Sequence, residues 1–182
     1  MATYTIYLFT TLDGFGTGRV AFWGKEGPEL LEQRFRTYAE EDQTLVFGAN
    51  TYRLLARFAP AEEDPTFAPL NAARKIVISR TLEEPLTWAN SMLIAEDALD
   101  AVPRLKAESP VPLRSHGSIA MNRALLAAGL VDRLEVMVFP AIAGTSGEQP
   151  ILAGLPDIDL ELVDSRLFDG RVQQLVYIPT VL

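Results

Sequence analysis

Residues 113–140 read LRSHGSIAMNRALLAAGLVDRLEVMVFP, and this stretch decides the expected fold. At Gly117 the chain must turn from a strand into a helix within very few residues, which glycine allows because it accepts backbone angles that other residues avoid. The helix is expected to begin at a Ser118 cap and to stop at Gly129. Residues 134–138 then alternate with a period of two, which predicts a strand. A strand–helix–strand unit of this kind occurs with or without a ligand, so the pattern alone leaves the function open.

Length and composition limit the class of protein. The chain has 182 residues, 48% of them hydrophobic, which predicts a single domain over residues 1–182 with a full core. A net charge of -8 argues against a nucleic-acid partner. No apolar run approaches the roughly 20 residues that span a bilayer. The absence of cysteine and of a basic N-terminal segment favours a cytoplasmic protein, and a single histidine excludes a multi-histidine zinc site.

Other periodic segments predict an α/β protein. The opening strand, residues 3–10, is apolar on both faces, which is typical of a strand covered on two sides. Asp169-Gly170 between two alternating runs, residues 160–168 and 171–178, predicts an antiparallel hairpin. Further strands are expected at residues 43–48, 75–78, 92–94 and 111–114, helices at 26–41 and 97–106, and loops at 11–18, 58–71 and 140–154. The sum is a mixed, mostly parallel sheet with helices on both faces, ending in an antiparallel hairpin.

Three strand ends carry groups that suit a phosphate. They are residues 48–51, 79–81 and 116–118, which offer glycine turns, hydroxyl groups and the Arg80 guanidinium. Taken singly, residues 48–51 are also explained as a helix cap by Asn50 or Thr51, and residues 79–81 as a solvated strand end. Because the carboxyl ends of parallel strands gather at one edge of an open sheet, the three together indicate a nucleotide site.

Two residues near the first loop have open roles. Three glycines in residues 11–18 do not have the spacing of a dinucleotide fingerprint, so a flexible loop is expected there. Asp13 at the end of the first strand is either part of an Asp-Gly turn or a substrate contact. Trp23 either plugs the core or lines a pocket.

Four short motifs occur in a recognisable order: TLDG at residues 11–14, GANTY at 48–52, VISRTL at 77–82 and ALLAAGLVDRL at 124–134. With them, nearly the whole chain resembles the dihydrofolate reductase-like family, and specifically the C-terminal reductase domain of the bifunctional riboflavin-biosynthesis deaminase/reductase. The deaminase half has no counterpart, since its zinc site requires cysteines that this chain lacks.

The resemblance implies an NADPH-dependent oxidoreductase that transfers a hydride to a pyrimidine or pteridine-like small molecule, nominally 5-amino-6-(5-phosphoribosylamino)uracil. It also implies a homodimer. Asp13 would orient the substrate or a proton-donating water, and Trp23 and His116 would lie near the substrate. The cofactor would be held at Gly48 and Thr51 (phosphates), Ser79, Arg80 and Thr81 (2′-phosphate), and the backbone of Gly117, Ser118 and Ile119 (pyrophosphate and nicotinamide).

Two departures from the family pattern keep alternatives open. Ala49 replaces a basic residue that many relatives carry, which leaves the 2′-phosphate to Arg80 and does not exclude NADH. His116 replaces a second glycine of the turn, so it contacts a ligand, partly blocks the site or is structural. The alternatives are dihydrofolate reductase activity, using a carboxylate among Glu26, Glu29 and Glu32, and a dimeric nucleotide-binding protein without turnover.

Overall fold

A computed structural model describes residues 1–19, 26–40, 42–58 and 67–182. Eight strands form one sheet in the order β5-β4-β3-β6-β1-β7-β10-β9. They are β1 (Tyr4–Thr11), β3 (Thr44–Gly48), β4 (Arg74–Ile78), β5 (Ser91–Ile94), β6 (Leu113–His116), β7 (Arg133–Phe139), β9 (Ile158–Phe168) and β10 (Val172–Val181). Neighbours from β5 to β7 pair in parallel, whereas β10 pairs antiparallel with β7 and β9. The predicted mixed, mostly parallel sheet with its closing hairpin is confirmed.

Strand β1 lies at the centre, and every one of its residues is buried. Its alternate side chains face two different layers, because successive residues of a strand point to opposite faces. Ile6 and Leu8 pack in the core that includes helices α4 (Ala98–Glu108) and α5 (Ile119–Ala127). Tyr7 and Phe9 pack with Leu30 of helix α1 (Pro28–Glu40). Helices therefore cover both faces, as the apolar pattern of the strand predicts.

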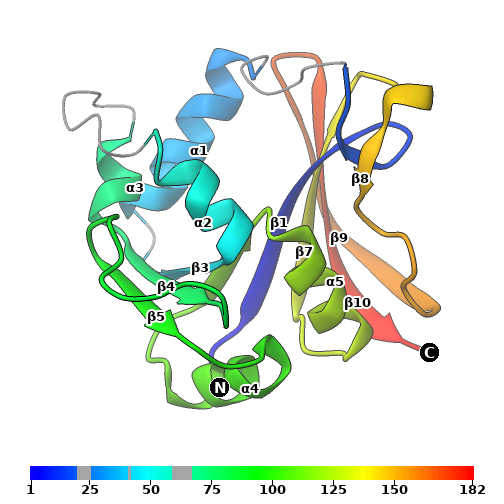
Figure 1. Ribbon diagram of the computed structural model, residues 1–182. Coiled ribbons are helices and arrows are strands. Elements are labelled where there is room, and N and C mark those ends of the chain that lie inside the picture. Colours follow the sequence, from blue (N-terminus) through cyan, green and yellow to red (C-terminus); the bar gives the residue numbers. More distant parts are fainter. Residues whose placement is uncertain (20–25, 41, 59–66) are drawn as a thin grey trace.

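The two remaining helices, α2 (Ala49–Leu55) and α3 (Ala68–Ala72), lie beside α1, whereas α4 and α5 lie apart from them (Figure 1). Within the described ranges, no helix combines the length and the apolar character needed to cross a membrane.

The structure corrects two expectations about the connections. The loops at 11–18 and 140–154 contain two short strands, β2 (Phe15–Thr17) and β8 (Glu148–Pro150), which pair with each other. The stretch 58–71, expected to be an exposed loop, ends in α3, where Pro69 occupies the first turn and needs no hydrogen-bond acceptor. Helix α4 continues through Pro103 to Glu108, which confirms the helix expected at residues 97–106.

The hairpin turn also anchors α1. The carboxylate of Asp169 accepts hydrogen bonds from the backbone N–H groups of Glu29 (3.0 Å) and Leu30 (3.2 Å). The Glu29 carboxylate accepts in return from the backbone N–H of Asp169 at 2.7 Å. This reciprocal arrangement satisfies donors that the first turn of a helix leaves unpaired. The hairpin and α1 are thereby fixed to each other.

Replacing Asp169 by alanine should lower the free energy of unfolding by about 2 kcal/mol. The lost cap accounts for about 1 kcal/mol. Holding alanine in the left-handed conformation costs about as much again, since Asp169 has a φ of 51°. Asp169→Asn is the matched control, because asparagine keeps an acceptor and tolerates this φ. Urea unfolding measures both variants, and equal losses in the two would contradict the capping role.

Candidate functional site

The three strand ends predicted to bind phosphate lie along one edge of the sheet. Strands β4, β3 and β6 are adjacent and parallel, with Gly48 opposite Ile78 and Val46 opposite Ser115. Residues 79–81, 48–51 and 116–118 therefore follow neighbouring strands at the same, carboxyl edge. Segments about 70 residues apart in sequence are brought together there.

Ser118 joins two of these turns directly. Its hydroxyl accepts the backbone N–H of Gly48 at 2.9 Å and donates to the carbonyl of His116 at 3.1 Å. Its own N–H donates to the hydroxyl of Thr51 at 2.8 Å. Ser118 has φ 46° and ψ 41°, and its side chain makes no cap to α5. The expected cap of α5 by its hydroxyl is therefore wrong, and so is a cap of α2 by Asn50 or Thr51, because Gly48 occupies that position without a side-chain bond.

The two glycines of this edge meet different demands. Gly117 has φ 58°, and an added Cβ would lie 3.2 Å from the Thr51 hydroxyl oxygen, so the chain itself requires glycine there. Gly48 has φ −81°, which any residue adopts, and an added Cβ would have no neighbour closer than 3.6 Å. The backbone of the chain gives no reason for a glycine at position 48. A bare backbone at that point leaves room for a close-lying ligand such as a nucleotide phosphate.

Two cationic side chains lie at the third turn, its own Arg80 and Arg53 of α2. Within it, the Ser79 hydroxyl accepts the backbone N–H groups of Thr81 (3.1 Å) and Leu82 (3.2 Å). Arg80 is exposed and pairs with Asp97 at 3.5 Å. Arg53, from α2, donates to the carbonyl and the hydroxyl of Thr81, each at 3.4 Å. Two guanidinium groups thus flank residues 79–81.

Arg53 was missed in the sequence reasoning. The signal that could have found it is its spacing: it lies four residues after Ala49 and one turn along the same helix. Arg53 reaches the turn at residues 79–81 from the same helix that Ala49 begins.

Asp13 ties two loops together. Its carboxylate accepts the backbone N–H groups of Ala143 (3.0 Å) and Gly144 (2.8 Å), which lie beyond β7. Hydrogen bonding with the Thr11 hydroxyl, and then with these two N–H groups, lowers the pKa of Asp13 from 3.8 to about 2. Asp13 is therefore ionised at neutral pH and accepts hydrogen bonds rather than donating a proton.

This tether should depend on pH with a defined sign. Because the pKa of Asp13 is lower in the folded than in the unfolded chain, its stabilising bonds are complete above about pH 4 and are lost as the pH falls toward 2. Amide hydrogen exchange followed by NMR should show the Ala143 and Gly144 amides losing protection over this range. In Asp13→Ala the same two amides should already exchange faster at pH 6, with those of β7 unchanged. Unaltered protection at Ala143 and Gly144 in this variant would contradict the tether.

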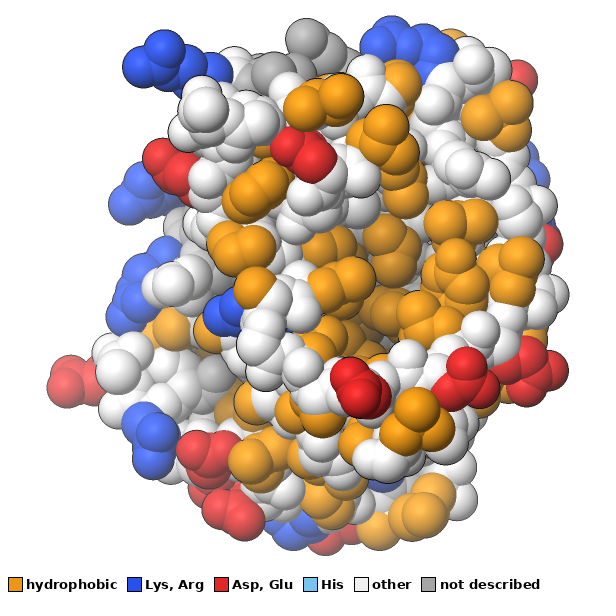
Figure 2. Space-filling view, turned by 90° about the vertical axis from the view of Figure 1, so that its right-hand side faces the viewer, with side chains coloured by type: hydrophobic (Ala, Val, Ile, Leu, Met, Phe, Trp, Pro, Cys, Tyr) orange, Lys and Arg blue, Asp and Glu red, His pale blue; other side chains and the backbone are white. Residues whose placement is uncertain are grey.

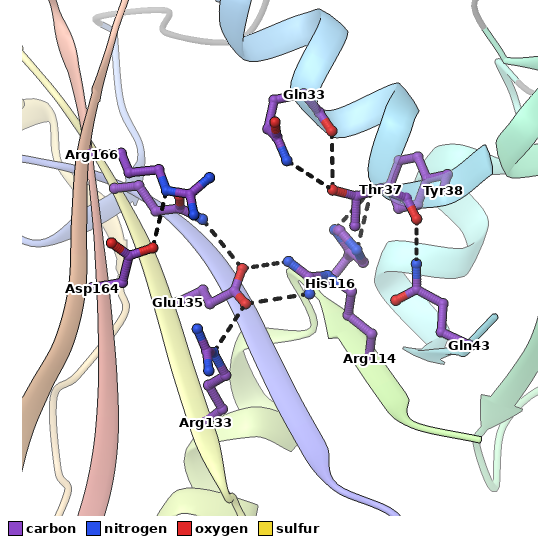
Figure 3. Close-up of polar contacts among 11 residues, drawn as sticks. Gln33, Thr37, Tyr38, Gln43, Arg114, His116, Arg133, Glu135, Asp164 and Arg166 are labelled. Carbon is purple, nitrogen blue, oxygen red and sulfur yellow. Dashed lines mark hydrogen bonds and ion pairs between the residues drawn. The ribbon is translucent and has the colours of Figure 1, made fainter. Parts of the chain in front are cut away.

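The side chain of His116 points away from the turn that its backbone forms. The imidazole lies 3.1 Å from the hydroxyl of Tyr38 on α1, and its ring centroid is 4.8 Å from that of Tyr7. Figure 3 shows it on the α1 side of the sheet. Burial, aided by the charges of Arg114 and Arg34, holds the pKa of His116 well below 6.5, so the ring is neutral. The imidazole lies beside a cavity under α1 and does not cross the glycine turn at Gly117.

The remaining predicted residues are Ile119, Trp23 and three carboxylates. Ile119 is the first residue of α5, and its side chain packs against the hydrophobic core, so only its backbone N–H can face a ligand. Trp23 lies outside the described residues, and its substrate role stays a prediction. The carboxylates weighed for dihydrofolate reductase activity all have partners: Glu26 pairs with Arg34, Glu29 bonds to Asp169, and Glu32 pairs with Arg36.

This open, mostly parallel sheet, with linked glycine turns at its carboxyl edge, is a dihydrofolate reductase-like fold. Residues 2–174 match the RibD C-terminal domain, and the chain belongs to that family. No curated protein sequence matches it.

Solved structures share this fold. A putative riboflavin biosynthesis protein from Shewanella sp. PV-4 has a TM-score of 0.77 at 19% identity, with 98% of this chain and 99% of that chain covered. A pyrimidine reductase-like protein from Corynebacterium diphtheriae has a TM-score of 0.71 at 13% identity, covering 98% and 92%. The diaminohydroxyphosphoribosylaminopyrimidine deaminase/5-amino-6-(5-phosphoribosylamino)uracil reductase of Thermotoga maritima has a TM-score of 0.67 at 15% identity, covering 98% of this chain and 57% of that one. At these identities the matches show that the folds are alike and nothing more.

Proposed function

We propose that this protein is an NAD(P)H-dependent reductase that acts on a pyrimidine-like small molecule. The observation that carries the proposal is the carboxyl edge of the sheet, where Ser118 links the Gly48 and Gly117 turns beside two guanidinium groups. Family membership supports it. The name of the Thermotoga maritima enzyme suggests 5-amino-6-(5-phosphoribosylamino)uracil as the first substrate to try.

The residues present fit a dinucleotide. The backbone at Gly48 leaves room for a phosphate. The N–H groups of Gly117 and Ser118 already donate to the Tyr7 carbonyl and the Thr51 hydroxyl, so a phosphate would accept from the first turn of α5, which begins at Ile119 and where the helix dipole favours negative charge. Arg80 and Arg53, with the hydroxyl of Thr81, would hold a 2′-phosphate by charge-assisted hydrogen bonds. When bound, the reduced nicotinamide supplies the hydride.

The chain itself would bind and orient the reactants. Asp13 is ionised, so it can accept a hydrogen bond from a substrate N–H group or hold a water molecule in place, whereas the reaction's proton must come from another donor. No protein nucleophile is needed, because alignment of donor and acceptor accounts for much of the rate in such transfers. Dihydrofolate reductase activity is less well supported, since Glu26, Glu29 and Glu32 are all engaged by other groups.

The test combines binding and turnover. NADPH titrated into the purified protein should raise its melting temperature and change nucleotide fluorescence. Gly48→Ala should melt at the wild-type temperature without ligand, because the backbone and the surroundings accept a methyl group, yet bind NADPH at least about tenfold more weakly. Loss of NADPH absorbance on adding the uracil substrate would establish reduction. Binding without turnover over a panel of pyrimidines and pteridines would favour a nucleotide-binding protein, and no binding at millimolar NADPH or NADH would overturn the cofactor proposal.

We further propose that two copies pair through strand β9. This edge strand exposes three leucines, with 39% of Leu160, 55% of Leu162 and 62% of Leu167 accessible. Hydrophobic side chains gather over this side of the molecule (Figure 2). Long, exposed, apolar edge strands tend to be covered by a partner.

Light scattering coupled to size exclusion should give about twice the 20.0 kDa of one chain. Leu162→Glu should give a single-chain mass, while Leu99→Glu, an exposed leucine on α4, should not alter the mass. A wild-type monomer at high micromolar concentration would contradict the pairing.

A further inference from the structure

The carboxyl edge of the sheet continues past the three turns described above to a fourth strand end. Strand β5 pairs in parallel with β4, so both strands end at the same edge. The backbone N–H of Ser79 donates to the carbonyl of Ile94, the last residue of β5, at 3.0 Å. Residues 95–97 therefore lie beside the turn at residues 79–81. This fourth strand end carries two adjacent acids.

The two acids are directed at different partners. Glu96 accepts from Arg104 of α4 with both carboxylate oxygens, at 2.9 and 3.0 Å. Asp97 lies at the start of α4, where its Oδ1 accepts the backbone N–H of Leu99 at 3.1 Å. Its Oδ2 lies 3.5 Å from a guanidinium nitrogen of Arg80. Asp97 is therefore the acid that reaches the turn at which a 2′-phosphate would bind.

The ion pair between Asp97 and Arg80 is loose and open to solvent. The side chain of Asp97 is 43% exposed and that of Arg80 is 71% exposed. Their separation of 3.5 Å is long for a charge-assisted hydrogen bond. Exposed pairs of this kind contribute little to stability, so the guanidinium can exchange the carboxylate for another acceptor at small cost.

The two arginines at this turn are not equivalent. The printed contacts of Arg53 are with uncharged groups, namely the carbonyl and hydroxyl of Thr81 and the side-chain oxygen of Asn50, each at 3.4 Å. Arg80 instead faces the carboxylate of Asp97. In the free protein the positive charge of Arg80 is therefore already offset by a neighbouring acid.

A 2′-phosphate would compete with Asp97 for Arg80. Both are anions that accept from a guanidinium. A phosphate held by Arg53 and Arg80 would also lie close to the Asp97 carboxylate, and like charges at short range repel each other. The 2′-hydroxyl of NADH carries no charge, and a carboxylate can accept a hydrogen bond from such a ribose hydroxyl. The turn thus places groups that favour the phosphate next to one that disfavours it.

We propose that Asp97 is a specificity-determining residue that lowers the preference of this edge for NADPH over NADH. It offsets the charge of Arg80 in the free protein and repels a bound 2′-phosphate, whereas it accepts a hydrogen bond from the 2′-hydroxyl of NADH. This inference rests on the proposed function, because it assigns a role within the proposed nucleotide site.

Asp97→Asn tests the charge alone. Asparagine keeps an oxygen for the Leu99 N–H and caps helices as well as aspartate does, so the variant should melt at the wild-type temperature without ligand. In fluorescence titrations of the full chain it should bind NADPH about fivefold more tightly, which is the size of a charge interaction between exposed groups. Its NADH affinity should change by less than about twofold, because the amide oxygen still accepts from the 2′-hydroxyl.

Glu108→Gln is the matched control. It removes the same charge from an exposed side chain at the far end of α4, about 16 Å along the helix from Asp97. That distance exceeds the Debye length of about 8 Å at physiological salt, so neither affinity should change. In about 1 M salt, where this length falls to about 3 Å, the NADPH gain of Asp97→Asn should also largely disappear.

Three results would overturn the proposal: an NADPH affinity that does not rise in Asp97→Asn, an equal gain for NADPH and NADH, or the same gain in Glu108→Gln. Each of them would leave the nucleotide site itself standing, because the wild-type protein would still bind its cofactor. If neither the wild type nor Asp97→Asn bound NADPH or NADH at millimolar concentration, the proposed function would fail together with this inference.

Discussion

Replacing both Arg53 and Arg80 by alanine is expected to weaken NADPH binding by about 100-fold and to leave NADH binding unchanged. Each guanidinium would make a charge-assisted hydrogen bond to the 2′-phosphate, and the loss of one such bond costs about tenfold in affinity. NADH lacks that phosphate. Fluorescence titration of both nucleotides at fixed ionic strength measures the two affinities.

Arg104→Ala is the control for a general change of charge, because Arg104 is an exposed arginine of α4 that pairs with Glu96 and Glu108. The single variants distinguish the two residues. If NADPH affinity fell in Arg80→Ala but not in Arg53→Ala, Arg80 alone would bind the 2′-phosphate, as the sequence predicts. Arg53 would then be only a structural partner of Thr81. An equal fall for NADH and NADPH would contradict a 2′-phosphate site at this turn.

Replacing Glu135 by alanine is expected to lower the free energy of unfolding by about 3–5 kcal/mol, the usual cost of leaving one member of a buried ion pair without its partner. Only 12% of the Arg114 side chain and 8% of that of Glu135 are exposed. The guanidinium of Arg114 would then remain buried next to Tyr7 with no counter-charge. Urea unfolding at neutral pH gives the change directly.

The double variant Arg114→Met/Glu135→Leu separates charge from packing. It should recover most of the lost stability, because two apolar side chains of similar size avoid the cost of burying charge. A loss below about 1 kcal/mol in Glu135→Ala would show that water reaches Arg114 readily. The cavity under α1, which Arg114 and Glu135 line, would then be a solvated groove.

Much of the fold can be predicted from the sequence, because local patterns of residues determine it. The first strand is apolar on both faces, and this alone predicts its central, doubly covered position. Asp169-Gly170 predicts the final hairpin because few other dipeptides accept such a turn. The β2–β8 pair could not be predicted, since three residues in each of two glycine-containing loops give no measurable alternation.

The carboxyl edge could be predicted because parallel strands must end on the same side, so three separate motifs converge without knowledge of their contacts. The contacts themselves could not. The Ser118 hydroxyl accepts from the N–H of Gly48 and does not cap its own helix, and this depends on how closely the two turns approach each other. The acidic strand end after β5 was also missed, because the sequence does not show that this strand lies beside β4.

The most direct test of nucleotide binding at the carboxyl edge is an NMR titration of the uniformly 15N-labelled protein with NADPH. The largest amide shifts are expected at Gly48, Ser118 and Thr81, with the amides of β9 unmoved. Shifts confined to other surfaces, or none at millimolar NADPH, would contradict the assignment of this edge as a nucleotide site.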